Sequence, residues 1–164
     1  MRALERVRPR RSWRMGVGRV RGNMLMLSVS YKEALYALCM GMATEAKSRV
    51  VPYQTLGVFA CLLQPKSRRE LDSFLSQLVA VLEQHDKHNN TELSETLLAY
   101  ARTNMSVKGT AEALYVHPNT VRYRVDMIRK VMSGFVLSEN IGVSLEVICT
   151  FLRWRDAYRA ESGE

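Results

Sequence analysis

Residues 107–130 read VKGTAEALYVHPNTVRYRVDMIRK, and this stretch decides the fold of the C-terminal half of the chain. Ser106 can cap a first short helix, and Pro118 can begin a second one, because proline is preferred at the first position of a helix. Only a short turn, with Tyr115 and Val116, remains between the two helices. They are therefore expected to meet at a sharp angle, as the helices of a helix-turn-helix do.

The apolar residues of the second helix, expected from Pro118 to about Lys130, predict which of its faces is buried. They recur at helical spacing and form one stripe, Val121, Val125, Ile128 and Met132. Ala111 in the first helix is small, so the two helices can approach closely where they cross. The opposite face of the second helix presents Asn119, Arg122, Tyr123, Asp126, Arg129 and Lys130.

The side chains of this outward face have the chemistry needed to read DNA bases. Asparagine can form two hydrogen bonds with adenine and arginine can do so with guanine, while Thr120 or Tyr123 can reach a phosphate or a thymine methyl group. The alternative is a helical hairpin whose exposed arginines only keep it soluble. Gly109 inside the first helix, and Tyr115 at a turn position where glycine is common, depart from an ideal unit.

Helical patterns surround this stretch. The run KSRRELDSFLSQLVAVLEQHDKHNN predicts a helix capped by Ser67 that buries Leu71, Phe74, Leu75, Leu78, Val79 and Leu82. A helix capped by Thr91 is expected next, and a last one is predicted by Ile141, Leu145, Ile148 and Leu152. His85, Asp86 and His88 share a helix end, but histidines there are more often solvated than bound to metal, so no metal site is expected.

Residues 15–66 read differently, as a fragment of an α/β domain. The run MGVGRV from residue 15 predicts a short strand, and SRVV predicts another before a turn at Pro52. The helix between them is expected to place Tyr31, Leu35, Leu38 and Met42 on one face. About 50 residues are too few for a complete α/β sheet, which needs more strands.

Charge is distributed unevenly along the chain. The net charge of +8 arises in residues 1–49, which carry eleven Lys or Arg against three Asp or Glu, whereas residues 91–164 carry nine of each. The basic balance therefore does not by itself support DNA binding by the C-terminal half. Residues 1–14 are expected to form a disordered basic tail, and a DNA-contacting arm is the alternative.

Other features exclude several classes of protein. Cys39, Cys61 and Cys149 are odd in number and lie in apolar runs, so they are expected to be buried thiols in a reducing cytoplasm. No apolar run approaches the ~18 residues of a membrane span, and none follows the twin arginine as in an export signal. No nucleophile–base pair and no glycine-rich phosphate loop is present, so neither an enzyme nor a cofactor is expected.

The run TAEALYVHPNTVRYRV at 110–125, with ELSETLLAY upstream, resembles the C-terminal helix-turn-helix of PucR-family bacterial transcriptional regulators, which include the sugar-diacid regulators. The family pattern is H-R-N-T-[VL]-R-Y-R-[LV], preceded by T-A-x-x-L, and Pro118 replaces its arginine here. Residues 15–66 resemble the end of the GGDEF-like central domain of these proteins. The resemblance implies a mainly α fold, with a Fis-like helix-turn-helix domain after a truncated α/β remnant.

The resemblance also implies a division of the chain and a function. Expected in order are a basic tail (1–14), a partial GGDEF-like remnant (15–66), a connecting helix and linker (67–90) and a helix-turn-helix DNA-binding domain (91–160). The family binds promoter DNA as dimers and controls catabolic operons in response to a small molecule. A cytoplasmic, homodimeric, sequence-specific regulator of double-stranded DNA is therefore expected. No membrane partner is expected, and the effector is unknown because the sensor domain is absent from this sequence.

Carried over to this sequence, the expected DNA contacts are Asn119, Thr120, Arg122, Tyr123 and Arg124, together with Lys108 and Lys130. Arg124 is near the buried edge of its helix, so a phosphate is its expected partner. Two alternatives remain open. The chain could act through protein–protein contact, by pairing with full-length relatives, or it could bind nucleic acid non-specifically through its arginine-rich tail.

Overall fold

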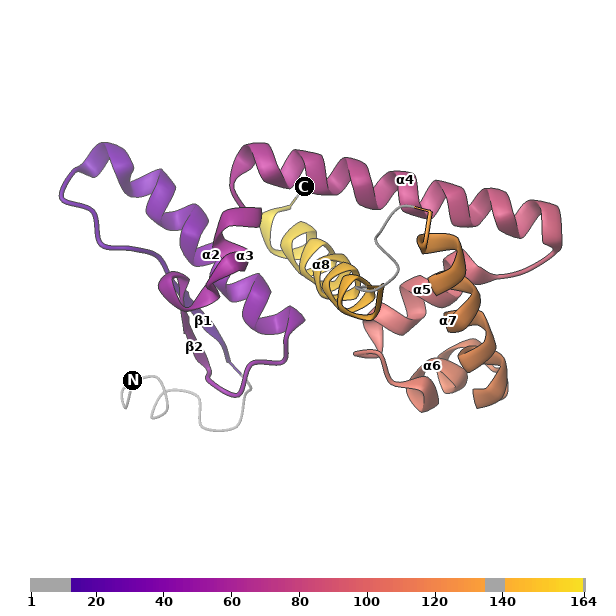
Figure 1. Ribbon diagram of the computed structural model, residues 1–164. Helices are drawn as coiled ribbons and strands as arrows, with labels where there is room; N and C mark the ends of the chain where they lie inside the picture. Colours follow the sequence, from indigo (N-terminus) through magenta and orange to yellow (C-terminus); the bar gives the residue numbers. More distant parts are fainter. Residues whose placement is uncertain (1–12, 135–140, 164) are drawn as a thin grey trace. The chain divides into compact units, whose positions relative to one another are not determined.

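The computed structural model describes residues 13–134 and 141–163, and the described chain is mainly helical (Figure 1). It divides into two compact units, Met1–Ala60 and Cys61–Glu164, and the short helix α3 (Val58–Leu62) spans the division. The prediction of a mainly α chain with a helix-turn-helix is confirmed. The predicted basic tail lies almost entirely outside the described residues. Among the helices that the structure describes, none is long and apolar enough to cross a membrane.

The first unit contains two short parallel strands connected by a helix. Strand β1 (Met15–Val17) pairs with β2 (Val50–Pro52), and α2 (Leu27–Ala43) provides the crossover that a parallel pair requires. The 3-10 turns η1 (Met24–Met26) and η2 (Tyr53–Leu56) precede α2 and follow β2. The predicted strand–helix–strand fragment is therefore confirmed, whereas its assignment to a GGDEF-like domain stays a prediction.

Helix α2 buries a different face from the predicted one. Tyr31 and Met42 are 66% and 38% exposed, and the buried residues are instead Glu33, Tyr36, Ala37, Cys39, Met40, Gly41 and Ala43. The reason is the close approach of strand to helix, because a Cβ on Gly16 would lie 1.9 Å from the carbonyl oxygen of Ala34. A face with small residues can pack this closely, and a pattern of bulky apolar residues does not reveal it.

Two of the three cysteines are buried as predicted. Cys39 and Cys149 have no exposed surface, and burial raises the pKa of the Cys149 thiol to about 12. Cys61 is exposed, contrary to the prediction, and lies in α3, a helix of only five residues. The apolar run around Cys61 therefore does not imply burial of every residue in it.

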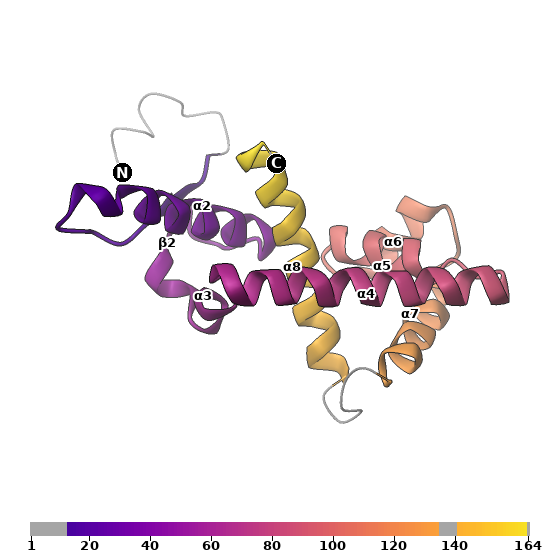
Figure 2. The same ribbon diagram turned by 90° about the horizontal axis from the view of Figure 1, so that it is seen from above.

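The second unit packs its described helices around a central one, α5 (Leu93–Arg102). Helix α5 contacts α4 (Pro65–Asn89), α6 (Val107–Leu114), α7 (Pro118–Met132) and α8 (Ile141–Ser162). Figure 1 shows α5 and α7 next to the C-terminal half of α4, with α6 on the far side of α5, and Figure 2 shows the same helices from above. Helix α5 thus packs against both α6 and α7, and α4 and α8 pack against α7.

The core of this unit follows the predicted apolar stripes of α7 and α8, whereas α4 buries Leu75, Leu78 and Leu82 and leaves Leu71, Phe74 and Val79 half-buried. The stripe of α7 is buried as predicted, at Val121, Val125, Ile128 and Met132. The stripe of α8 is buried at Leu145, Ile148 and Leu152, while the side chain of Ile141 lies outside the described part. Helix α4 begins at Pro65 rather than after the predicted cap Ser67, because proline can itself start a helix.

The N-terminus of α5 is capped by the preceding helix. Its N-cap residue, Glu92, makes no capping hydrogen bond with its side chain. Asp86 of α4 does so instead. Its Oδ1 accepts hydrogen bonds from the Leu93 N–H (2.7 Å) and the Thr91 hydroxyl (2.6 Å), and its Oδ2 accepts them from the N–H (2.9 Å) and hydroxyl (2.8 Å) of Ser94. Burial would raise the pKa of Asp86, but these hydrogen bonds outweigh it and lower that pKa.

Candidate nucleic-acid interface

Helices α6 and α7 meet at a sharp turn, as the sequence predicts. The hydroxyl of Ser106 caps α6 by accepting a hydrogen bond from the Gly109 N–H at 3.1 Å. Tyr115 ends α6 in the left-handed conformation (φ 54°), and the next N–H, of Val116, donates to the Ala111 carbonyl at 3.0 Å. This pattern is the Schellman arrangement. A turn position often held by glycine is thus occupied by tyrosine, at a cost of about 1–2 kcal/mol.

Small side chains allow α6 to pack tightly against its neighbours. Thr110 and Ala111 are 0% and 4% exposed. The hydroxyls of Thr103 and Thr110 lie 2.7 Å apart, and a Cβ on Gly109 would lie 3.3 Å from the Cβ of Thr103. Gly109 therefore has a packing role, because an added methyl group would press against the end of α5.

The start of α7 is capped by a histidine. The Nδ1 of His117 accepts a hydrogen bond from the backbone N–H of Asn119 at 3.2 Å, and Pro118 occupies the first helical position. The sequence predicts the start of a helix here. It does not predict that the His117 side chain caps this helix, because imidazole is not among the usual capping groups. The capped turn fixes the direction in which the first residues of α7 point.

Most of the predicted DNA-binding residues lie on the exposed face of α6 and α7. The exposed ones are Lys108, Asn119, Arg122, Tyr123 and Lys130, whereas Thr120 is half-buried. The Nη1 of Arg122 donates to the Oδ1 of Asn119 at 2.6 Å. Lys108 is 86% exposed and lies 3.9 Å from Glu112, so its ammonium is largely free for another partner.

Arg124 differs from the others because it binds within the domain. Its Nη2 lies 2.7 Å from a carboxylate oxygen of Glu92, and its Nη1 donates to the Thr96 hydroxyl at 3.4 Å. Its side chain is only 16% exposed. Arg124 therefore fastens α7 to the start of α5, and its contact with DNA phosphate stays a prediction.

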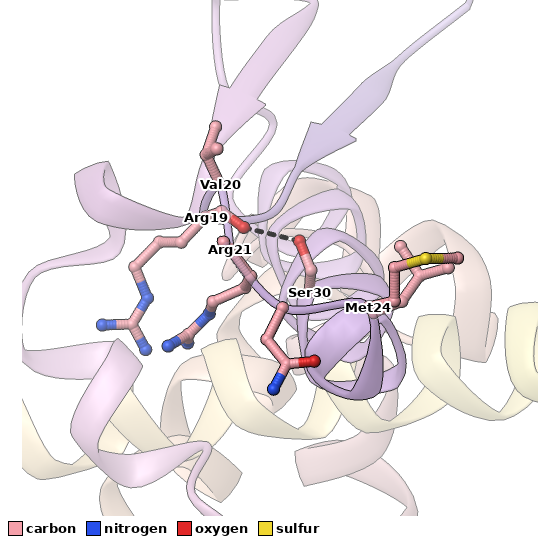
Figure 3. Close-up of a pocket in the computed structure, with 8 residues that line it drawn as sticks. Arg19, Val20, Arg21, Met24 and Ser30 are labelled. Carbon is pink, nitrogen blue, oxygen red and sulfur yellow. Dashed lines mark hydrogen bonds between the residues drawn. The ribbon is translucent and has the colours of Figure 1, made fainter.

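A second cluster of cations lies in the first unit. Arg19, Arg21, Met24 and Ser30 help to line a cavity of about 430 Å³, and Figure 3 shows the hydrogen bond from the Ser30 hydroxyl to the Arg19 carbonyl. Both guanidinium groups bind one carboxylate, that of buried Glu33, at 2.5 and 2.6 Å. Their charge is thus partly neutralised within the unit, which makes this cavity a weaker candidate for nucleic acid than α7.

The carboxylate of Glu33 gives the first unit a predictable response to acid. Burial alone would raise its pKa, but hydrogen bonds from Arg19 and Arg21 lower it from 4.5 to about 2. A lowered pKa in the folded state means that the stabilisation is present above pH 4.5 and is lost as the pH falls towards 2. We expect the protection of α2 amides, which is the intrinsic exchange rate relative to the observed rate at the same pH, to fall over this range. In Glu33→Gln exchange should already be faster at pH 7 and lack this component of the acid response; an unchanged variant would contradict the assignment.

Comparison with known proteins finds similar sequences among transcriptional regulators. Residues 93–147 match the family model described as the PucR C-terminal helix-turn-helix domain. The proline-responsive transcriptional activator PutR of Bacillus subtilis (strain 168) is 30% identical over 120 residues, covering 73% of this chain and 29% of PutR. The DNA-binding transcriptional activator AdeR of the same strain is 24% identical over 115 residues, covering 70% of this chain and 27% of AdeR. The chain thus spans less than a third of the length of these relatives. No solved structure matches it.

Proposed function

Because this chain belongs to the PucR family through its C-terminal helix-turn-helix domain, we propose that it is a sequence-specific, DNA-binding regulator of transcription. The observation that carries the proposal is the exposed start of α7. There Asn119, Arg122 and Tyr123 point away from a core that holds the helix rigidly from its other side. A rigid helix with such side chains on its free face is what major-groove recognition requires.

In this proposal α7 enters the major groove with its N-terminal turns foremost. Asn119 and Arg122 contact base edges, and Thr120 and Tyr123 contact phosphate or a thymine methyl group. Lys108 at the start of α6 and Lys130 near the end of α7 neutralise phosphates. Arg124 is a positioning residue, because its pair with Glu92 sets the angle of α7 on α5.

We further propose that the protein acts in the cytoplasm as a homodimer on a catabolic operon. A dimer would place two copies of α7 in successive major grooves, about 34–36 Å apart. The proline-responsive relative supports a nutrient as the signal, although no effector is assigned to this chain. The βαβ fragment of the first unit would be the end of a GGDEF-like domain, with a boundary near residue 66, before the linker and the DNA-binding domain.

Binding of the purified full chain to DNA tests this proposal. The DNA from upstream of its own coding sequence is compared with scrambled DNA of equal length over a salt series. We expect a preference of about 10³-fold or more that persists at physiological salt. Weak binding without preference, fading steeply with salt, would contradict it. Deletion of residues 1–14 tests the alternative in which the arginine-rich tail binds the nucleic acid. A protein that binds DNA through this tail would lose affinity for DNA on deletion, whereas one that binds through the helix-turn-helix would largely keep it.

The protein–protein alternative predicts a different pair of results. A partial regulator that pairs with full-length relatives would bind DNA feebly alone and form heterodimers on mixing. Exposed apolar residues in the first unit support this alternative, because such residues often mark protein–protein contact sites. Val20, Met24 and Leu25 are 99%, 89% and 85% exposed. Sedimentation of the chain with and without a co-expressed relative separates the two functions.

A further inference from the structure

We infer that the start of α7 reads guanine, because the groups that it exposes offer mainly hydrogen-bond donors. This inference rests on the proposed function and names the base that the same surface recognises. It differs from the simplest expectation for Asn119, which is a pair of hydrogen bonds with adenine. Three neighbouring side chains carry it.

The amide oxygen of Asn119 already accepts one hydrogen bond. The Nη1 of Arg122 donates to the Oδ1 of Asn119 at 2.6 Å, across three residues that share a helix face. The orientation of the amide follows from this contact, because turning it would bring its NH₂ group against the guanidinium donors. Asn119 therefore presents two free N–H donors to a ligand in front of the helix, while one of the two lone pairs of its oxygen is already taken by Arg122.

His117 adds a donor at the same end of α7. Its Nδ1 accepts the hydrogen bond from the Asn119 backbone N–H. A neutral imidazole that accepts at Nδ1 carries its proton on Nε2, so its remaining polar atom is a donor. The N-terminus of α7 contributes positive partial charge at this point as well.

The nearest acidic groups are each paired with a cation other than Arg122. Asp126, one turn beyond Arg122, binds Arg129 at 2.8 Å, and Glu92 binds Arg124 at 2.7 Å. The hydroxyls of Thr120 and Tyr123 can donate as readily as accept. The described start of α7 therefore favours a base edge made of acceptors.

Guanine is the base with such an edge in the major groove. It presents N7 and O6 side by side as acceptors, whereas adenine pairs its N7 with an amino donor and cytosine offers an amino donor. Thymine offers one acceptor beside a methyl group. Since Asn119 and Arg122 are joined as one unit, we expect them to read neighbouring positions that both favour guanine.

Selection of binding sites from random DNA with the full chain tests the inference. The wild type should select guanine at the positions that α7 reads. Arg122→Met removes one guanine contact and frees the Oδ1 of Asn119, so the variant should lose guanine at one position and gain adenine at its neighbour. Arg159→Met is the matched control, because that arginine is exposed in the last turn of α8 and not on α6 or α7. Its selected sequence should be unchanged.

A chemical probe distinguishes guanine N7 from other sources of preference. Replacing the selected guanines by 7-deazaguanine removes the N7 acceptor and should weaken wild-type binding about 10-fold. Selection of adenine by the wild type, or indifference to 7-deazaguanine, overturns the inference while leaving sequence-specific binding intact. If the protein selects no sequence at all, both the proposed function and the assignment of guanine are wrong.

Discussion

Replacing Asp86 with alanine is expected to lower the free energy of unfolding of the helical unit by about 2–4 kcal/mol, which is large for a single polar side chain. The loss is large because one carboxylate accepts four hydrogen bonds at the start of α5. Without it the N–H groups of Leu93 and Ser94 lose their partner. Helix α5 is the centre of the unit, so its fraying should loosen α6 and α7 together. Chemical denaturation followed by circular dichroism measures the change.

Glu83→Ala is the matched control for this substitution. Glu83 is an exposed acid on the same helix, and its removal should change stability by less than about 0.5 kcal/mol. The lowered pKa of Asp86 gives a second readout. Its stabilisation is present above the ordinary carboxyl range and is lost as the pH falls through the lowered value, so Asp86→Ala should lack this part of the acid response. Equal effects of the two substitutions would contradict the capping role.

This cap shows where local sequence patterns stop being informative. Thr91 looks like the cap of α5 because it lies just before the helix, and its hydroxyl does take part, but as a donor to Asp86. Asp86 itself lies in the preceding helix, where the sequence suggests an ordinary surface residue or a metal ligand and not a cap of the next helix. Only the turn between α4 and α5 brings the carboxylate to the start of α5, so the pairing depends on tertiary structure.

The two units differ in how well their sequences predict them. Helix α7 is amphipathic, with one apolar stripe, and its buried and exposed faces are both as predicted. Helix α2 packs through small residues against Gly16, and such a face has no bulky periodic signal. Strand β1 is recognisable from its composition, but its partner and parallel register follow from the crossover. The periodicity of apolar residues thus predicts the buried face of α7, but it does not predict the buried face of α2, which packs closely against the backbone of a strand.

The candidate site was predictable as a surface and not as a set of contacts. The exposed positions of α7 follow from 100° per residue, which is why Arg122 and Lys130 are exposed as expected. The hydrogen bond between Asn119 and Arg122 is compatible with their spacing, but the spacing does not determine that Arg122 binds Asn119 instead of water. The pair of Arg124 with Glu92 joins two helices, and no pattern in the sequence connects them.

Enlarging Ala111 should have the largest effect on DNA binding, because it separates the two helices of the helix-turn-helix. Ala111 is 4% exposed where α6 contacts α7, and its carbonyl accepts the hydrogen bond that closes the turn. Leucine there would overpack the contact at a cost of about 1–3 kcal/mol. We expect Ala111→Leu to displace α7 relative to α6 and to lower affinity for the selected DNA by about 100-fold or more, since a misplaced helix loses several base contacts together.

Ala113→Leu separates this packing effect from any effect of leucine itself. Ala113 is exposed on the same helix, one residue beyond Glu112, and alanine and leucine have similar helix propensities. Its replacement should leave the free energy of unfolding nearly unchanged and affinity within a few-fold of the wild type. Titration of each variant with selected and scrambled DNA gives the comparison. If Ala111→Leu keeps full affinity and specificity, recognition does not depend on the angle between α6 and α7.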